Sequence, residues 1–116
     1  MSCTPSSGTL PFAANFEVTL TNQYTEFSRV IDGRISVALA GGQFYSNWKS
    51  GQVTLGAGES FNRSFNQVLP NLGTVIGTNT FTLIAEDTTP SPFNQPPYFP
   101  SGDMDSSVCT VEGVSP

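Results

Sequence analysis

The chain has 116 residues, a net charge of −5 at pH 7 and no histidine. This length is enough for one domain with a single hydrophobic core. Only 11% of the residues are charged, against roughly 25% in typical soluble domains. One lysine and three arginines cannot neutralise a phosphate backbone, so the composition excludes nucleic acid as a partner.

The N-terminal residues, 1–10, carry no strand signal and are predicted to form a tail. A single domain is predicted over residues 11–116. Its first strand is clear, because Phe16, Val18 and Leu20 alternate with polar residues, as a half-buried β-strand requires.

The middle of the chain predicts four more strands. Residues 34–48 indicate two strands joined by a hairpin, with Gly41 and Gly42 supplying the backbone freedom of a tight turn. Short strands are then predicted over residues 52–55 and 60–68. In the second of these, Arg63 interrupts a phenylalanine face, which indicates an edge position or a β-bulge.

The last part of the chain predicts two strands, at residues 78–86 and 107–114, on either side of a long loop. No window of eleven residues shows a 3.6-residue period, so no helix longer than a turn is expected. Seven or eight short, mostly antiparallel strands separated by glycine and proline turns predict an all-β, immunoglobulin-like sandwich of two sheets.

Three segments of the chain resemble a known family. They are "FEVTLTN" at residues 16–22, "VTLGAGESFNRSF" at residues 53–65 and "GTNTFTLIAEDTTP" at residues 77–90. With these segments, residues 11–114 resemble the bacterial and archaeal immunoglobulin-like modules of the CARDB (cell-adhesion-related) family. The resemblance implies a seven-stranded sandwich in secreted or surface-attached proteins, repeated in tandem as spacer or adhesive modules.

The chain has two cysteines, Cys3 and Cys109, one near each end. In many β-sandwiches the first and last strands are close together, so an intramolecular disulfide is expected. Two separate thiols, or a bridge from Cys3 to Cys109 of a neighbouring molecule, remain alternatives. Any such bridge implies an oxidising compartment, which for this chain predicts an extracellular or cell-surface location.

Four acidic residues flank the long loop and form a candidate calcium site. Glu86 and Asp87 end one predicted strand, and Asp103 and Asp105 precede the next. Carboxylates brought together repel one another unless a cation neutralises them, and Ca²⁺ prefers such oxygen ligands. The alternative is that all four side chains are spread in solvent.

The loop itself, residues 88–106, contains five prolines and three aromatic residues. It predicts either a stiff polyproline strap, a partner-binding surface or a disordered segment. In an immunoglobulin-like sandwich the loop between the second and third strands, taken here as "QYTEFSR" at residues 23–29, lies at the same end as this loop. Aromatic residues of the two segments therefore predict a contact surface for protein partners, with closure of the core as the alternative: Tyr24, Phe27, Phe93, Tyr98 and Phe99.

The sequence favours a non-catalytic function, since the chain lacks the usual general base. The first hypothesis is an extracellular structural or adhesive module that contacts neighbouring modules. The second is a self-assembling subunit of an extracellular filament or sheath, joined by its tail, an edge strand or an intersubunit disulfide. The third is carbohydrate binding through Phe44, Tyr45 and Trp48. No run of apolar residues predicts membrane insertion.

Overall fold

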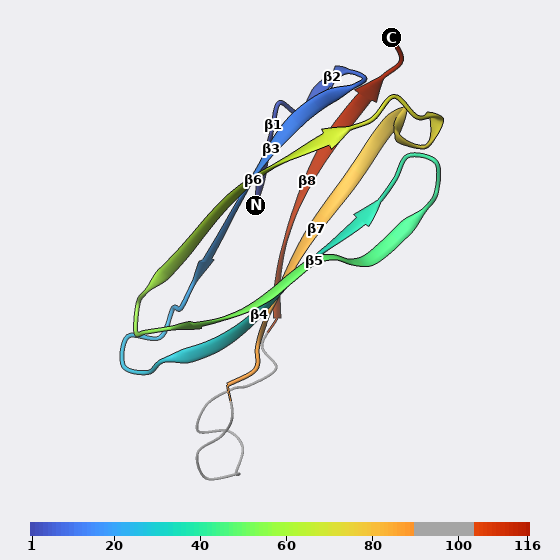
Figure 1. Cartoon of the computed structure of the whole chain (residues 1–116). Helices are drawn as coiled ribbons and strands as arrows, with labels where there is room; N and C mark the ends of the chain where they lie inside the picture. Colours follow the sequence, from blue (N-terminus) through green and yellow to red (C-terminus); the bar gives the residue numbers. More distant parts are fainter. Residues whose placement is uncertain (90–103) are drawn as a thin grey trace.

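The computed structural model of the chain describes residues 1–89 and 104–116. Within these ranges the chain forms eight strands and one 3-10 turn, which confirms the all-β prediction. The elements in chain order are β1 (Ser2–Thr4), β2 (Ser7–Thr9), β3 (Phe12–Thr21), β4 (Arg29–Ala38), β5 (Phe44–Leu55), β6 (Ser60–Leu69), η1 (Gly73–Val75), β7 (Gly77–Asp87) and β8 (Met104–Val114) (Figure 1).

The strands form two sheets that face one another. One sheet has the order β1-β3-β6 and the other the order β2-β8-β7-β4-β5. All pairs are antiparallel except β2 with β8, which is parallel. After β3 the chain crosses between the sheets from β3 to β4, from β5 to β6 and from β6 to β7, as sandwich topologies do. The predicted two-sheet sandwich is therefore confirmed.

Residues 1–10, predicted as a tail without a strand signal, contain two short strands, β1 and β2. β1 pairs with β3, placing Cys3 opposite Phe16, and β2 pairs with β8, placing Gly8 opposite Gly113. Between these two strands the chain passes from one sheet to the other. Strands of three residues are too short to show a hydrophobic period, so local pattern could not reveal them.

The predicted break before residue 52 is wrong, because β5 continues from Phe44 to Leu55. Gly51 does not interrupt the ladder but pairs with Gly33 of β4. The predicted hairpin between β4 and β5 is confirmed, and Gly42 has a φ of 93° there. Conformations of this kind favour glycine, which has no Cβ to clash with the backbone.

An aromatic cluster fills the middle of the sandwich. Phe16 is fully buried, and its ring centroid lies 4.6 Å from that of Phe81, 5.4 Å from Phe65 and 5.6 Å from Trp48. These rings come from four strands of both sheets, so the cluster joins the layers. The buried core around it consists of aliphatic and aromatic side chains, which are Leu10, Ala14, Phe16, Val18, Leu20, Ile31, Ile35, Val37, Leu55, Leu69, Val75, Phe81, Leu83 and Val111.

Two buried asparagines hold loops at the opposite ends of the sandwich. The Asn22 side-chain amide donates hydrogen bonds to the carbonyls of Phe27, Leu55 and Gly56. Asn79 likewise donates to the carbonyls of Val75, Gly77 and Val111. Buried polar groups of this kind are stable only when they are hydrogen-bonded, so each asparagine fixes its loops against the core.

The two long sides of the sandwich are formed by different strands. β1 contacts β8 on one side, and β5 contacts β6 on the other. The molecule is elongated, with extents of 57 × 23 × 15 Å and a radius of gyration of 16.8 Å, compared with about 13 Å for a compact domain of this length. We call the side between β5 and β6 the β5–β6 seam.

Candidate functional site

The closed side of the sandwich carries a disulfide between Cys3 of β1 and Cys109 of β8. The two Cα atoms are 6.0 Å apart and the cysteines are separated by 106 positions in the sequence. Both cysteines are half-buried and pack against the core. The bridge joins the two sheets within one molecule, which confirms the predicted intramolecular disulfide. The structure therefore has neither two separate thiols nor an intermolecular bridge.

A buried ion pair lies at the end of the sandwich where β7 ends. Arg29 Nε donates to Asp87 Oδ2 at 2.6 Å, and the Arg29 side chain is 1% exposed. The Tyr24 ring lies beneath the guanidinium, whose central carbon is 4.8 Å from the ring centroid. Thr89 donates to Asp87 Oδ1 from both its backbone N–H and its hydroxyl. This end is therefore organised by a charged network and not by apolar packing alone.

The network changes the acidity of Asp87. Burial by itself would raise the pKa of this carboxyl, but the hydrogen bonds from Arg29 and Thr89 outweigh burial and hold the pKa below its usual value. Asp87 is therefore ionised at neutral pH. Its charge is balanced by Arg29.

The candidate calcium ligands do not all face one space. Strand alternation directs Glu86 and Asp87 to opposite faces of β7, and Asp87 is paired with Arg29. Asp105 lies on the same face as Asp87 and accepts a hydrogen bond from the N–H of Ser106. Asp103 lies outside the described residues. No group of three or more His, Cys, Asp or Glu occurs within residues 1–89 and 104–116, and calcium binding stays a prediction.

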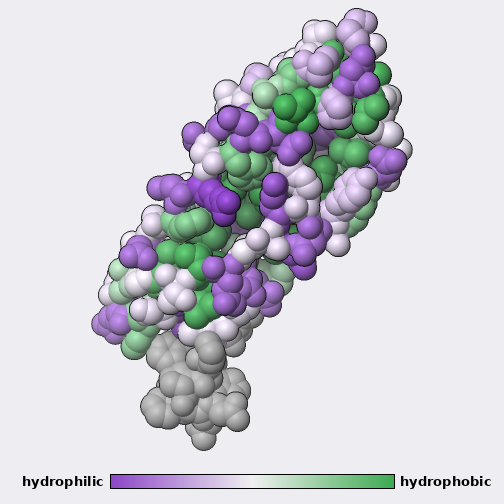
Figure 2. Space-filling model, viewed as in Figure 1, coloured by the Kyte–Doolittle hydropathy of each residue, from purple (hydrophilic) through white to green (hydrophobic). Residues whose placement is uncertain are grey.

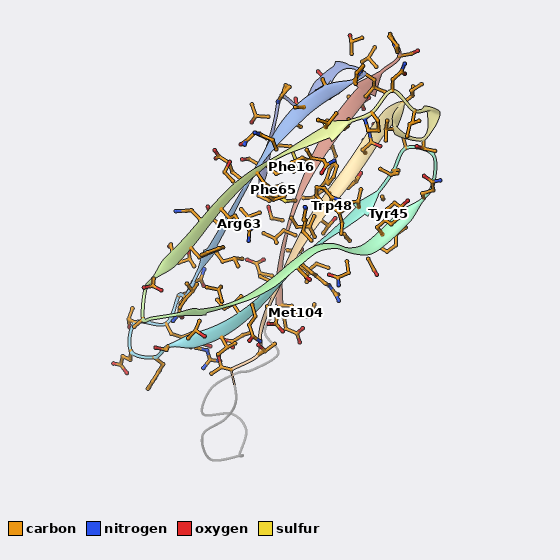
Figure 3. All side chains as sticks on the ribbon, viewed as in Figure 1. Phe16, Tyr45, Trp48, Arg63, Phe65 and Met104 are labelled. Atoms are coloured by element: carbon orange, nitrogen blue, oxygen red, sulfur yellow. A yellow bond between two sulfur atoms is a disulfide. The ribbon has the colours of Figure 1, made fainter. Side chains whose placement is uncertain are left out.

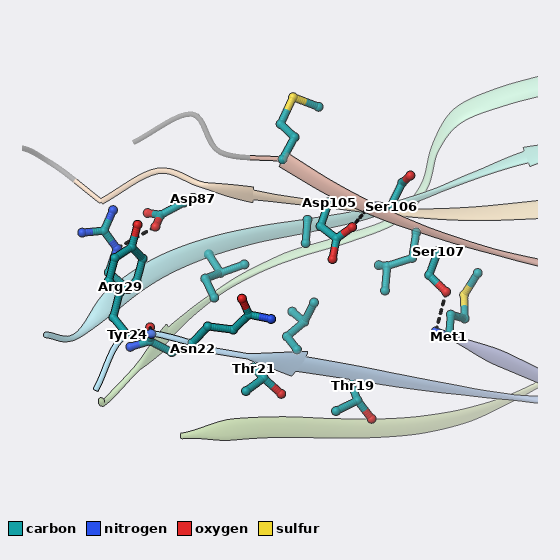
Figure 4. A pocket seen from close by; sticks show the side chains of 16 residues that line it. Met1, Thr19, Thr21, Asn22, Tyr24, Arg29, Asp87, Asp105, Ser106 and Ser107 are labelled. Carbon is teal, nitrogen blue, oxygen red and sulfur yellow. Dashed lines mark hydrogen bonds and ion pairs between the residues drawn. The ribbon is translucent and has the colours of Figure 1, made fainter. Parts of the chain in front are cut away.

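A groove of about 530 Å³ opens beside this network, between β3 and the start of β8 (Figure 4). β1 covers the edge of β3 only as far as Glu17, so Thr19 and Thr21, which pair with β6 on one side, border the groove on the other. The amino group of Met1 donates to Ser107 Oγ at 2.9 Å. The groove is thus lined by hydroxyls and charged groups of both sheets.

The predicted aromatic contact surface is described only in part. The segment that contains Tyr24 and Phe27 lies at the same end of the sandwich as the end of β7, since Thr88 N–H bonds to the carbonyl of Val30. Tyr24 is half-buried beneath Arg29, and Phe27 is 44% exposed. The other three residues, Phe93, Tyr98 and Phe99, lie outside the described residues. The contact role stays a prediction.

The β5–β6 seam exposes part of the aromatic cluster. Trp48 and Phe65 are half-buried, with their ring centroids 5.7 Å apart, and both lie between the two edge strands (Figure 3). A hollow of about 500 Å³ beside them is bordered by Leu39 and Val68. In the space-filling view, hydrophobic residues are visible in a hollow along this side (Figure 2). The core therefore meets solvent here.

The three aromatic residues considered for carbohydrate binding do not share one surface. Phe44 and Tyr45 are 64% and 53% exposed. Trp48 instead packs inward against Phe16, Phe65 and Phe81. Carbohydrate binding through these residues stays a prediction, since nothing in the packing tests affinity for a sugar.

A second cavity of about 230 Å³ lies further along the seam, where Gly33 and Gly51 pair across β4 and β5. A Cβ built on Gly51 would meet no atom within 4 Å. The two glycines leave an apolar space between the sheets, bordered by Phe61 and Phe65 of β6. We call this space the glycine socket.

Three cations line the glycine socket: Arg34 of β4, Lys49 of β5 and Arg63 of β6. Lys49 is opposite the buried Ile35, and Arg63 is opposite the buried Val18, so both side chains start from the inner faces of their strands. Lys49 Nζ lies 5.4 Å from the Trp48 ring centroid and 5.5 Å from that of Phe65. No aspartate or glutamate lines the socket. Within the described ranges the single ion pair is that of Arg29 with Asp87.

Sequence reasoning missed the seam as a site. The prediction that Arg63 marks an edge strand is confirmed, because β6 is the edge of its sheet. Nothing in the sequence around Lys49, apart from its position after Trp48, indicated a role in binding. The pairing of Gly33 with Gly51 joins residues far apart in the sequence, so no local pattern could have revealed the socket.

Comparison of the chain with models of protein families, with curated proteins and with solved structures found no match in any of the three. The resemblance to the CARDB family therefore rests on strand and turn residues alone. Within the described residues there is also no helix long and apolar enough to span a membrane. The disulfide is typical of an oxidising environment.

Proposed function

We propose that the protein is a non-catalytic structural or adhesive module of an extracellular or cell-surface assembly, with a role like that of the CARDB-like modules it resembles. The observation that carries this proposal is the Cys3–Cys109 bridge, which spans 106 positions and joins the first strand to the last. Such a bridge suits a module that must keep its fold outside the cell while it is held by its neighbours.

The physical argument concerns the path of a mechanical load. A force applied to the chain outside Cys3 and Cys109 passes through the covalent bridge. The segment between the cysteines includes β3 to β7 and most of the core, and it carries none of that force. The sandwich thus remains folded under tension, whatever the strength of its hydrogen bonds.

Single-molecule stretching tests the proposal, with handles attached at the two ends of the chain. The oxidised protein should show no release of the sandwich. After reduction, or in a Cys3→Ser variant, unfolding should lengthen the chain by about 350–380 Å, the extended length of the segment that the bridge encloses. Release of that length from the oxidised protein would contradict the proposed role.

A second function is favoured by the outer edges of β5 and β6, beside which no strand lies in the described part of the chain. Such edges can pair with another chain, so a self-assembling subunit of a filament or sheath is the alternative proposal. The N-terminal segment is engaged with its own domain through β1 and β2, so assembly would use the edge strands. Sedimentation velocity over a hundredfold range of concentration separates the two: a constant monomer supports the module, and growth with concentration supports the subunit.

A further inference from the structure

The β5–β6 seam has the features of a site that binds an extended strand. β6 is hydrogen-bonded to β3 and β5 to β4, and in the described part of the chain neither has a strand on its other side. The outer backbone groups of an edge strand can pair with an incoming segment, and alternate side chains of that segment then turn inward. In this protein the space they would enter contains the glycine socket.

The socket selects apolar side chains by its shape and lining. Leu20 and Leu83 border it from the two sheets, together with the Phe61 ring. Its volume of about 230 Å³ exceeds the about 150 Å³ of apolar cavities that hold benzene. An aliphatic side chain entering from the seam would gain burial without displacing any side chain of β5, because Gly51 has none.

Lys49 and Arg63, the two cations that start from inner strand faces, determine which strand can enter the socket. Inward-pointing charges on edge strands normally prevent pairing with other edges. A second copy that entered the seam with its own β5 or β6 would bring Lys49 and Arg63 against the same residues, so the self-assembly alternative would need a pairing that keeps these cations apart. A segment with a carboxylate beside its apolar residue would instead find two cations near the rings of Trp48 and Phe65 and no carboxylate in the lining.

We propose that the β5–β6 seam binds an extended acidic segment of a protein partner, which pairs with the outer edge of β6, places an apolar side chain in the glycine socket and directs a carboxylate to Lys49 and Arg63. This inference names the kind of partner for the adhesive role proposed above and rests on it. The seam would discriminate between partner segments because its cations attract acidic segments and repel basic ones.

An acidic polysaccharide could satisfy the same two cations, but the rest of the seam favours a peptide. A sugar ring needs a free aromatic face, whereas Trp48 packs against Phe16, Phe65 and Phe81. The unpaired edge of β6 offers alternating donors and acceptors, which match a peptide backbone. The cavity floor is aliphatic, which suits a leucine or valine side chain.

Calorimetric titration with synthetic peptides tests this inference on the oxidised full chain. The probe is a nine-residue peptide in which threonines alternate with valine, leucine, glutamate and valine. We expect it to bind at least tenfold more tightly than the same peptide with glutamine for glutamate. A lysine version should not bind, and binding of the acidic peptide should weaken as salt concentration rises.

Variants of the protein locate the binding. The double substitution Lys49→Gln with Arg63→Gln should weaken binding of the acidic peptide at least tenfold. Gly51→Leu should abolish it by filling the socket from within, while the protein remains folded. Asn62→Ala is the control, because Asn62 lies next to Arg63 on the outer face of β6, where it accepts a hydrogen bond from Thr19, and it does not line the socket. That variant should bind within twofold of the original protein.

Equal binding of the acidic and neutral peptides, or binding that survives both the charge and the socket substitutions, would overturn the inference. Binding of oligoguluronate in place of the peptide would overturn it in favour of a glycan. Lys49, Arg63 and Gly51 lie apart from the disulfide, so stretching of the oxidised protein should be the same in these variants. A failed peptide titration with normal stretching therefore rejects the seam and leaves the proposed function standing.

Discussion

The two long sides of this sandwich are built in contrasting ways. On one side, β1 and β8 are joined by a disulfide that packs against the buried Phe16 cluster. On the other side, β5 and β6 leave Trp48 and Phe65 half-buried and turn two cations toward an apolar socket. One side has a covalent bridge between the sheets, while the edge strands of the other side have no such link.

This difference separates stability from recognition. Binding elements are drawn from the less stable parts of a protein, since they must be able to accommodate a partner. A sandwich closed on both sides would be more stable but would offer no edge to a partner. The disulfide stabilises the folded protein and so can offset the weaker packing along the β5–β6 seam. The protein can then stay folded with this side open.

The largest expected effect comes from breaking the closed side. The double substitution Cys3→Ser with Cys109→Ser should lower the free energy of unfolding by about 4–5 kcal/mol, the chain-entropy value for a loop of this length. Urea denaturation with and without reductant measures the loss. The double variant should be insensitive to reductant, and a loss below about 1 kcal/mol would mean that the bridge does not constrain the fold.

The next largest effect is the stability lost when a ring of the aromatic cluster is removed, which should differ between the core and the seam. Phe16→Ala should cost about 3–4 kcal/mol, because it leaves a cavity among fully buried side chains. Phe65→Ala on the open side should cost at most about half as much, since its ring is only partly buried. Chemical denaturation of both variants gives the ratio. Equal losses would show that the seam is packed as tightly as the core.

The Arg29–Asp87 ion pair at the end of the sandwich makes the stability of the protein depend on pH. Asp87→Asn should lower stability at pH 7 by about 2–3 kcal/mol, because it leaves the buried Arg29 without this anion. The pKa of Asp87 is lower in the folded protein than in the unfolded chain, where it is near 3.9. The stabilisation is therefore fully present above about pH 4 and is lost as the pH falls through the folded value.

Urea denaturation at a series of pH values measures this effect. The difference in stability between the original protein and Asp87→Asn should shrink as the pH is lowered below about 4. Thr19→Ala, on the exposed face of β3, is a control that should leave the pH dependence unchanged. A difference that stays constant down to pH 2 would contradict the depressed pKa of Asp87.

The smallest expected effect is an increase in stability. Gly51→Val should raise the free energy of unfolding by about 0.5–1 kcal/mol, since glycine weakens a strand interior and the new side chain meets open space. Gly113→Val is the contrasting variant, because its Cβ would collide with the carbonyl oxygen of Val75. Thermal denaturation should show a higher midpoint for the first and failure to fold for the second.

Strand alternation allowed much of the sandwich to be predicted from sequence. The inward positions of Phe16, Val18 and Leu20 are confirmed, as are the hairpin after β4 and the edge position of β6. These features depend on residues close together in the chain. The disulfide could also be proposed, since two cysteines permit one intramolecular pairing.

Features that depend on pairing between residues far apart in the sequence could not be predicted from local sequence patterns. The strands β1 and β2 are defined by their partners β3 and β8 and not by their own residues. The glycine socket needs the register that brings Gly33 opposite Gly51. The burial of Asp87 beside Arg29 also joins residues 58 positions apart, which is why the sequence placed that carboxylate with Glu86 in a calcium site.

Hydrogen exchange of the oxidised protein tests the central contrast between the closed and open sides most directly. We expect amides of β4 and β7, which have strands on both sides over most of their length, to exchange slowest. Amides on the outer edges of β5 and β6 should exchange faster, and the acidic peptide should slow those of β6. Equal protection of the β6 edge and of β4 in the free protein would contradict an open side.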